Sequence, residues 1–425
     1  MTNERTTCVV VGGGPAGMVL GLLLARAGVE VTVCEKHADF LRDFRGDTVH
    51  ASTLTLLDEL GLGQRFAALP QRRIDGLQIQ LDGGTAKIAA LSRLPGTHQH
   101  IALVPQWDFL DLLADAAGEE ASFTLLREAE VVDLLHEDGR VVGVRYRDRA
   151  AGTEHELRAT LTVAADGRHS DVRHAAGLHP RAFGVPMDVW WFRLPRRADD
   201  PAGGLGRISR GQFMVMIDRG TYWQCGYLIP KGADATLRTE GIEAFQQRLV
   251  GLQPWLADRI SALHSFDEVK LLEVRLERLR RWYADGLLFI GDAAHAMSPV
   301  GGVGINLAVQ DAVAAARILA PALRTGGAIP VAALRRVQIR RWWPTALIQA
   351  LQRLAHRVVV LRALARPTDA PVATSLPVPL RLLERYPVLQ TVPGFLVAIG
   401  PLPEHAPDWA RRAAQPSPTS GTTVG

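Results

Sequence analysis

The chain has 425 residues, enough for two to three domains, and its 47% hydrophobic and 22% charged residues are typical of a globular protein. The formal net charge is +4, and only four of the 48 basic residues are lysines, a bias that indicates a GC-rich genome rather than a nucleic-acid surface. The three cysteines have no paired spacing, and we find neither a leader pattern nor an apolar run of about eighteen residues. We therefore expect a cytoplasmic protein with no metal site, no transmembrane segment and no nucleic-acid partner.

The first element is a strand that leads through a glycine-rich turn into a helix. The apolar run Val9–Val11 is followed by Gly12-Gly13-Gly14-Pro15-Ala16-Gly17, which has the spacing GxGxxG. The first glycine of this spacing permits a tight turn, the second lets the backbone approach a pyrophosphate, and the third lets the helix pack on the strand. A pyrophosphate would then bind the free N–H groups at the positive end of the helix.

The next strand covers residues 30–34 and is followed by Glu35 and Lys36. A carboxylate at this distance from the glycine turn is placed to accept hydrogen bonds from the two hydroxyls of an adenosine ribose. The same carboxylate would repel a 2′-phosphate. The pair of elements therefore predicts a site for FAD or NAD rather than NADP.

Further along, strands and helices alternate. We expect a helix over 53–60, strands of a second sheet within 74–104, an amphipathic helix over 106–117 and a β-meander over 131–165. A strand-rich block over 183–275 includes 222–229 and a helix near 243–252. A short strand at 287–290 precedes a helix over 304–319, and a helical stretch over 331–366 is expected to break at Pro344.

This order predicts an α/β protein with a Rossmann-like FAD-binding domain, an inserted β-rich substrate domain and a helical C-terminal region. The expected FAD-binding domain takes residues 1–73, 105–180 and 276–330, and the substrate domain takes 74–104 and 181–275. The helical region covers 331–410, and we expect a disordered tail over 411–425.

Two more motifs follow strands and open helices. The first runs from Asp166-Gly167 to Arg173, and the second runs from Gly291-Asp292 through Pro299 to Asn306. Asp292 is a suitable acceptor for a polyol hydroxyl, and the glycines of 301–304 would let the backbone approach a flat ring. The helix that begins at Gly304 would direct its positive end toward that ring, which favours developing negative charge.

Together these residues resemble the single-component flavoprotein monooxygenases of the para-hydroxybenzoate hydroxylase type. That family has three signatures in this order, GxGxxG, DGxxSxVR and GDAAHxxxPxxGxGxN, which match Gly12–Gly17, Asp166–Arg173 and Gly291–Asn306. The resemblance covers roughly residues 5–365. It implies FAD as cofactor, NADPH or NADH as cosubstrate, and oxygen transfer from a flavin C4a-hydroperoxide to an electron-rich, aromatic or polyketide-like small molecule. We expect a monomer or homodimer.

The resemblance also implies roles for single residues. Glu35 would bind the adenosine ribose, Arg45 and Gln106 the phosphates and ribityl chain, and Asp292 the ribityl chain. Asp166 and Arg173 belong to a segment that the family associates with FAD and NAD(P)H together. The full set of expected cofactor-binding residues is Gly12, Gly14, Pro15, Ala16, Gly17, Glu35, Lys36, Arg45, Gln106, Asp166, Gly167, Asp292, Pro299, Gly304, Ile305 and Asn306.

Candidates for catalysis are His50, Pro299 and Gly304, whereas we interpret His295 as structural. Tyr222, Trp223 and Gln224 lie on a predicted strand of the inserted sheet and are candidate substrate contacts, although strand alternation directs about half of them away from the substrate.

Three other flavin activities and one non-enzymatic function compete with this hypothesis. A flavin halogenase would need a Trp-x-Trp-x-Ile-Pro strand and an active-site lysine, but the corresponding strand reads Cys225-Gly226-Tyr227-Leu228-Ile229-Pro230. An alkene epoxidase or a reductase of the geranylgeranyl reductase type would use the same nucleotide site. A carrier or interaction protein that had lost catalysis would be expected to have lost Pro299–Asn306, which is intact.

Overall fold

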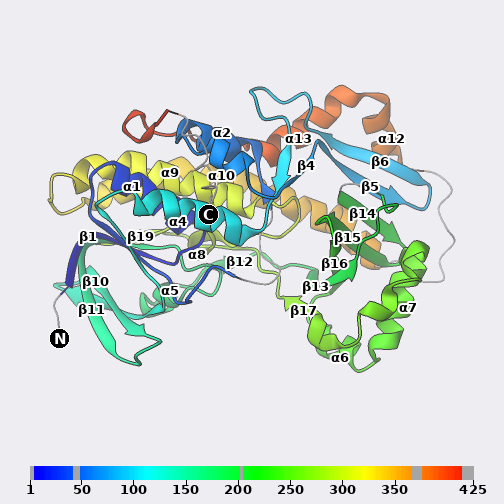
Figure 1. Cartoon of the computed structure of the whole chain (residues 1–425), viewed down its shortest axis with the longest axis horizontal. Helices are drawn as coiled ribbons and strands as arrows, with labels where there is room; N and C mark the ends of the chain where they lie inside the picture. The colour runs from blue at the N-terminus through cyan, green and yellow to red at the C-terminus, as the bar shows by residue number, and fades with distance from the viewer. Residues whose placement is uncertain (1–3, 42–47, 202–203, 366–375, 414–425) are drawn as a thin grey trace, which may run out of the picture.

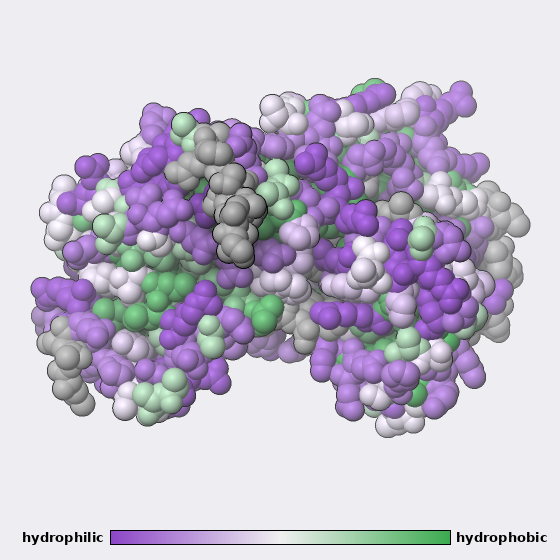
Figure 2. All heavy atoms as spheres, in the orientation of Figure 1, coloured by the Kyte–Doolittle hydropathy of each residue, from purple (hydrophilic) through white to green (hydrophobic). Residues whose placement is uncertain are grey.

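The computed structural model describes residues 4–41, 48–201, 204–365 and 376–413. Within these ranges the strands form two large sheets, and the long helices α9 (Gly304–Leu323) and α10 (Val331–Ala355) lie along the molecule beside the first of them (Figure 1). The space-filling view shows two lobes that are joined above and separated below by a notch (Figure 2).

The first sheet is centred on β1 (Glu4–Val11), which pairs in parallel with β2 (Val31–Cys34) and β11 (Glu154–Ala164). Residues Cys8–Val11 are buried because helices or strands cover both faces of this central strand, which is the usual environment of a continuous apolar run. The outer members of this eight-stranded sheet are β8 (Phe123–Leu126), β9 (Ala129–Glu137), β10 (Arg140–Asp148), β19 (Tyr283–Ala284) and β20 (Leu287–Phe289).

Helices α1 (Pro15–Arg26), α4 (Gln106–Gly118) and α9 pack together on this sheet around one buried apolar cluster. The run Met18–Leu24 of α1 is buried throughout, and burial of each large side chain contributes about 1.5–3 kcal/mol. This packing holds the N-terminal ends of α1 and α9 against the carboxyl ends of the parallel strands, where ligands of open α/β sheets bind.

A small three-stranded sheet is made of β3 (Thr48–Val49), β4 (Arg72–Ile74) and β7 (Ile101–Leu103). In the chain, helices α2 (Ala51–Glu59) and α3 (Gly63–Ala67) lie between β3 and β4. Within the range 74–104, in which the sequence predicts strands of the second sheet, β5 and β6 do join that sheet, whereas Ile74 and residues 101–103 pair in this small sheet instead. The antiparallel pairing places Thr48 opposite Leu103 and Val49 opposite Ala102, and the half-buried Gln106 opens α4 three residues after β7 ends.

The second sheet has seven strands drawn from two separate stretches of the chain. Its order is β17-β13-β16-β15-β14-β5-β6, and the bounds are β5 (Gly76–Leu81), β6 (Gly84–Ala90), β13 (Met187–Pro195), β14 (Gly204–Ser209), β15 (Gln212–Asp218), β16 (Tyr222–Pro230) and β17 (Lys270–Leu272). One face packs against α7 (Ile242–Leu252), near α6 (Asp234–Arg238). The opposite face shares a buried cluster with Val300, so it is turned toward the loop before α9.

Short elements connect these bodies. They are α5 (Asp171–Ala175), β12 (Arg181–Ala182), the 3-10 turns Pro254–Leu256, Ile260–Ala262 and Phe266–Glu268, β18 (Glu277–Arg278) and α8 (Asp292–His295).

The C-terminal part begins with α10, which continues through a π-helical turn, His356–Val360, into α11 (Leu361–Leu364). The predicted break at Pro344 is wrong, since the helix runs through this buried proline. A proline in a helix interior costs about 3 kcal/mol, and the packing of Leu334 and Val337 into the core beside α9 outweighs that cost.

The remaining helices α12 (Val378–Arg385) and α13 (Thr391–Ala398), with the 3-10 turn Pro387–Gln390 between them, lie beside β6. A last 3-10 turn, Asp408–Ala410, contacts α1. The predicted disordered tail is wrong for residues 411–413, where Arg411 contacts Glu59; residues 414–425 lie outside the described residues. Within the described ranges, no helix has the length and apolarity needed to cross a membrane.

Candidate flavin site

The glycine turn between β1 and α1 is tightly packed on one side and open on the other. A Cβ on Gly17 would lie 1.9 Å from the Gly12 carbonyl oxygen, and Gly12 has a φ of +104°. At Gly14, which precedes Pro15 and Ala16 of α1, a Cβ would meet no atom within 4 Å. No side chain caps α1 and its first turn has no acidic residue, so its N–H groups are free to bind an anion.

Glu35 lies at the end of β2 beside this turn. Its Oε2 accepts a hydrogen bond from the Gly13 N–H at 2.9 Å, and its Oε1 accepts one from the His37 N–H at 3.1 Å. These bonds fix the carboxylate where the predicted ribose would lie. The next residue, Lys36, is exposed, and Arg45 lies outside the described residues.

The segment after β11 forms a capped turn against the same glycines. Asp166 Oδ2 accepts a hydrogen bond from the Val172 N–H at 3.1 Å, and Ser170 caps α5 by accepting one from the Arg173 N–H at 2.9 Å. The other oxygen, Oδ1, is buried and has no partner among the described residues. Burial raises the pKa of the Asp166 carboxyl despite hydrogen bonds to it. Asp166 and the open Gly167 therefore offer an acceptor to a cofactor hydroxyl.

Arg173 joins this segment to the second motif. Its guanidinium is buried and donates to the Ala293 carbonyl at 3.0 Å and to the Arg168 carbonyl at 2.8 Å. Arg168 in turn donates to Asp292 Oδ2 at 3.3 Å. Arg173 therefore holds the backbones of the two motifs together, and its association with FAD and NAD(P)H stays a prediction.

Asp292 opens α8 after Gly291, whose φ of +58° and close approach to Ala308 and Ala16 favour glycine. The Gly291 N–H donates to Asp311 Oδ2 at 3.0 Å, and the same oxygen pairs with His295 Nε2. Arg341 donates to the other oxygen of Asp311 at 3.0 Å. His295 is therefore buried and structural, as interpreted from the sequence.

The carboxyl of Asp311 is fully buried within this ionic cluster. Burial by itself would raise the pKa of Asp311, but the His295 imidazole, the Arg341 guanidinium and the Gly291 N–H together hold it below its usual value. An ionised carboxylate thus orients the backbone that carries Asp292. Asp311 and Arg341 were not predicted as site residues, since neither belongs to a recognised motif.

The loop from Ser298 to Val303 leads into α9. Pro299 is half-buried and its carbonyl accepts a hydrogen bond from the Gly302 N–H at 3.0 Å. Gly304 and the half-buried Ile305 begin α9, which has no side-chain cap. Asn306 is buried and its Oδ1 accepts hydrogen bonds from Ser52 at 2.7 Å and Thr53 at 3.0 Å. The free end of α9 is thereby fixed against α2.

Polar side chains of α10 hold this loop from behind. Gln352 donates to the carbonyls of Ser298 and Val300, both at 2.9 Å, and its Oε1 accepts from the Ser298 N–H at 3.2 Å. His356 Nε2 lies 2.8 Å from Ser298 Oγ. Gln349 donates to the Ala296 carbonyl at 3.2 Å. The sequence had no signal for these contacts, because they join residues more than fifty positions apart.

His50 reaches the same loop from β3. Its Nδ1 lies 2.7 Å from the Val397 carbonyl of α13, so this nitrogen donates. Burial lowers the pKa of His50 and keeps the ring neutral. Its Nε2 is buried, has no partner among the described residues, and lies on the Gly302 side of the ring. The neutral ring therefore presents an acceptor toward the loop predicted to border the flavin.

We expect the stability of the FAD-free protein to depend on His50 in mild acid. Burial lowers the pKa of His50 from 6.5 to about 4. The unfolded chain binds a proton below about pH 6.5, whereas the folded chain does not until about pH 4, so this contribution is complete above pH 6.5 and decreases down to pH 4. The loss should reach about 3 kcal/mol in the unfolding free energy.

Denaturant unfolding of wild type and His50→Gln across pH 4–7 measures this effect. The difference between the two curves should be largest at pH 7 and should shrink toward pH 4. A difference that stays constant with pH would show that His50 is not held neutral by burial.

Strand β16 carries the three predicted substrate residues, and the structure corrects one of them. Trp223 is completely buried in the cluster against α7 and donates to Asp200 at 2.8 Å, so it points away from the FAD-binding part. Gln224 is the next residue along the strand, so with Gly226 and Leu228 it lies on the sheet face opposite α7. Its side-chain oxygen accepts a hydrogen bond from Arg219 at 3.1 Å. Tyr222 is half-buried under the Arg193 guanidinium.

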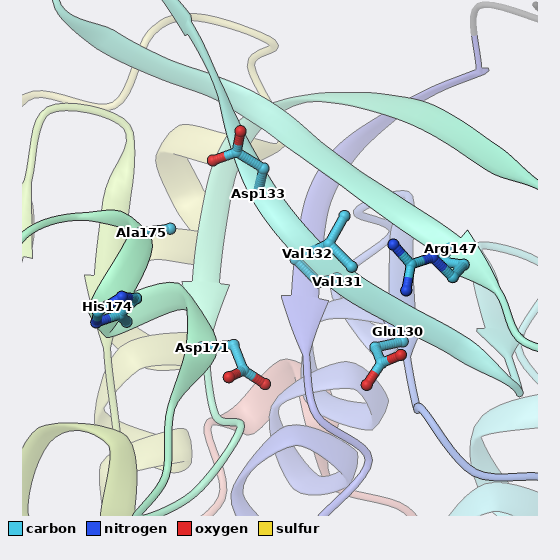
Figure 3. Close-up of a pocket in the computed structure, with 8 residues that line it drawn as sticks. All are labelled: Glu130, Val131, Val132, Asp133, Arg147, Asp171, His174 and Ala175. Carbon is cyan, nitrogen blue, oxygen red and sulfur yellow. The ribbon is translucent and has the colours of Figure 1, made fainter.

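A polar groove of about 460 Å³ lies apart from these residues, between β9 and α5 (Figure 3). Glu130 and Asp133 on its wall lie within 4.0 Å of Arg149 and Arg145. Since these acids already have basic neighbours, we assign the groove no ligand.

Comparisons with known proteins identify the family. A family model described as an FAD binding domain matches residues 5–331. The chain is 34% identical to 6-methylpretetramide 4-monooxygenase of Streptomyces rimosus over 90% of this chain and 92% of that protein. It is 27% identical to an aromatic compound monooxygenase of Bacillus subtilis over 74% of this chain, and spans 62% of that relative's length.

Among solved structures, P. aeruginosa PqsL in complex with 2-aminobenzoylacetate has a TM-score of 0.72, 22% identity, and coverage of 85% of this chain and 98% of its own. The predicted α/β fold with a Rossmann-type FAD-binding part is confirmed. The chain belongs to the family of FAD-dependent aromatic monooxygenases, and it is an enzyme that uses FAD, NAD(P)H and O₂.

The residues present fit this cofactor. The open space at Gly14, the uncapped ends of α1 and α9, and the unpartnered Oδ1 of Asp166 match an anionic pyrophosphate, a flat ring with developing negative charge and a hydroxyl. When bound, FAD supplies hydride acceptance and oxygen activation.

Proposed function

We propose that the enzyme hydroxylates a bulky, oxygen-bearing aromatic compound of polyketide type between the seven-stranded sheet and the loop before α9. The observation that carries this proposal is an apolar cluster in which the half-buried Trp191, Phe213 and Val300 pack around the buried Leu228. Aromatic and aliphatic side chains of one sheet face there meet the loop expected to border the flavin. Such a surface suits an extended apolar ring system.

One polar group in this surface supports an oxygenated substrate. The Nε1–H of Trp191 is buried and has no acceptor among the described residues. A buried donor without an acceptor costs about 1–3 kcal/mol, which a carbonyl or phenol oxygen of the substrate would recover. The similarity to a 6-methylpretetramide monooxygenase is consistent with a substrate of this kind.

The contacts at the flavin site support the following further roles. Gly12, Gly14 and Gly17 with Glu35 bind the adenosine diphosphate end, and Asp166 and Asp292 bind hydroxyls of the chain that follows. Gly304, Ile305 and Asn306 direct the positive end of α9 toward the ring, and Pro299 borders it. His50 accepts a hydrogen bond at the ring or the substrate. The apolar sheet face excludes water, which protects the oxygen transfer from a wasteful side reaction.

Tyr222 and Gln224 lie at the beginning of β16, whereas Leu228, which belongs to the apolar cluster with Val300, lies near its end. Leu228 lies six residues beyond Tyr222, which corresponds to about 20 Å along a strand. We therefore propose that Gln224 and Tyr222 contact only the distal end of a long substrate, and that the reacting carbon lies near Trp191 and Leu228.

The test is stimulated NAD(P)H oxidation by the FAD-loaded enzyme with a panel of polycyclic phenols and quinones and a panel of single-ring phenols. Trp191→Phe keeps an aromatic, though smaller, side chain and removes the donor, so KM for a polycyclic substrate should rise about tenfold with a smaller change in kcat. The matched control is Trp223→Phe on the opposite face, which should change thermal stability but not KM.

Oxygen uptake, peroxide release and incorporation of labelled O₂ are recorded with each substrate. Incorporation of one oxygen atom with little peroxide supports the proposal. Turnover of a polycyclic substrate at full rate without oxygen would replace the hydroxylase with a reductase. Equal stimulation by single-ring phenols, with no effect of Trp191→Phe, would reject the substrate class and the site.

A further inference from the structure

Helix α10 and its continuation are amphipathic in the reverse of the usual sense. The polar side chains Arg341, Thr345, Gln349, Gln352 and His356 lie three or four residues apart and are buried. In a surface helix the buried stripe is normally apolar and the exposed stripe polar. The inner stripe of α10 is polar because it binds the backbone of the flavin-site loop and Asp311.

The outer face of the same helix is apolar and exposed. Its large side chains repeat every three or four residues from Ile339 to Leu361, a length of about 33 Å at helical rise. Ile339 is 59% exposed and Leu354 is 58% exposed. The members of this outer stripe are Ile339, Trp342, Trp343, Leu347, Leu351, Leu354, Val358, Val359 and Leu361. A contiguous apolar stripe of this length marks an interaction surface.

The charges around the outer stripe indicate the kind of partner. Residues 331–365 contain seven arginines and no acidic residue. Arg335 and Arg336 are exposed before the stripe, and Arg357 and Arg362 are exposed near its end. A second copy of the chain would bring these like charges together in either orientation. An anionic partner is therefore favoured over self-association.

We propose that the outer stripe of α10 and α11 lies on an anionic lipid bilayer, with Ile339–Leu361 in the headgroup region. An exposed ridge of Leu and Val with two adjacent tryptophans and arginines at both ends is the composition of a helix lying in the membrane plane. A ridge needs no complementary groove in the partner, whereas docking on an acidic protein would. The helix lies on the bilayer and does not cross it.

This position would also set the substrate face close to the membrane. Val360 and Leu364, next to the end of the outer stripe, belong to the same buried cluster as Trp191, Leu228 and Val300. A substrate dissolved among lipids would therefore have a short path to the cluster. The polar inner stripe would remain in contact with the flavin-site loop.

The experiment is sedimentation of the FAD-loaded enzyme with vesicles of phosphatidylcholine and with vesicles containing 30% phosphatidylglycerol. Binding is expected to the second kind and to weaken as salt is raised. A double variant, Leu347→Glu with Leu354→Glu, should reduce partition at least tenfold. The matched control is Leu271→Glu, which changes a leucine of similar exposure, 43%, on β17.

Melting temperature and flavin content of each variant are measured first, and both should equal wild type, since the changed side chains point to solvent. A triple variant, Arg335→Gln, Arg336→Gln and Arg357→Gln, should lose the preference for phosphatidylglycerol. Absence of binding to either vesicle would overturn the proposal. So would a dimer in light scattering that Leu347→Glu with Leu354→Glu dissociates, because the stripe would then be a subunit interface.

Discussion

Replacing Gly17 with alanine is expected to abolish FAD binding and to destabilise the protein itself. The new Cβ would lie 1.9 Å from the Gly12 carbonyl oxygen and 3.4 Å from Val10. A backbone oxygen cannot move aside as a side chain can, so the turn between β1 and α1 must open. Overpacking of this kind costs about 3 kcal/mol in unfolding free energy, and the N–H groups that face the pyrophosphate would move with the turn.

Gly14→Ala separates the two functions of the glycine spacing. Gly14 has a φ of −74°, which alanine adopts readily, and a Cβ there meets nothing in the protein. The FAD-free variant should therefore unfold within about 0.5 kcal/mol of wild type. Its affinity for FAD should nevertheless fall, because the methyl group would occupy the open side of the turn where the pyrophosphate approaches.

Flavin fluorescence titration and denaturant unfolding of both FAD-free variants distinguish these effects. We expect Gly17→Ala to fail in both measurements and Gly14→Ala to fail only in the titration. Wild-type affinity in Gly14→Ala would mean that the cofactor does not pass over this residue. Wild-type stability in Gly17→Ala would contradict the tight contact with Gly12.

Asp311→Asn is expected to cost about 3–5 kcal/mol of stability. The variant removes the charge that Arg341 and His295 share. The buried Arg341 guanidinium would keep only Glu404, at 3.6 Å, as a carboxylate partner, and Glu404 already pairs with Arg340. The amide of asparagine has only one acceptor oxygen, so it cannot accept hydrogen bonds from both Arg341 and the Gly291 N–H as the two oxygens of Asp311 do. Because Gly291 precedes Asp292, FAD affinity should fall together with stability.

The contribution of Asp311 to the unfolding free energy should depend on pH, and it should decrease in acid. The pKa of Asp311 in the folded protein is below its usual value of 3.8, so the folded state favours the ionised form. The contribution is complete above that usual value and is lost as the pH falls through the lower folded pKa. The difference in unfolding free energy between wild type and Asp311→Asn should therefore be constant near neutral pH and decrease only in strong acid.

The control is Glu154→Gln, which removes the partner of Arg147 in an exposed ion pair of 3.2 Å. Exposed pairs contribute less than about 1 kcal/mol, so this variant should match wild type in stability and in flavin content. An Asp311→Asn protein that is equally stable would show that the buried charges do not depend on one another.

The sequence predicted the parts of the site that depend on neighbours in the chain. The spacing from Gly12 to Gly17 and the distance from that turn to Glu35 follow from one strand, one turn and one helix, and the family comparison confirms the cofactor they imply. Gly291 and Gly304 likewise lie within one strand, loop and helix. Local periodicity also predicted α7 and the strands of the meander, whose residues alternate or repeat as their burial requires.

Prediction was wrong where packing opposed a local preference. Pro344 lowers helix stability in any isolated segment, but in α10 the neighbouring side chains are buried beside α9 and the helix continues. Trp223 and Gln224 were indistinguishable as substrate contacts, because alternation gives two faces and not which of them meets the cofactor. Helix α7 covers the face of β16 that carries Trp223, so only the opposite face, with Gln224, is turned toward the FAD-binding part.

By itself, then, the sequence determined the Rossmann-type turn, the FAD-binding motifs and the class of chemistry, because each depends on residues a few positions apart. The tertiary structure decided what supports and surrounds them. Val397 fixes the proton of His50 from 347 positions away, and His356 meets Ser298 from 58 positions away. Such contacts depend on how α10 and α13 dock against α9 and the flavin-site loop, and no local spacing encodes a docking that arises from the summed burial of many distant side chains.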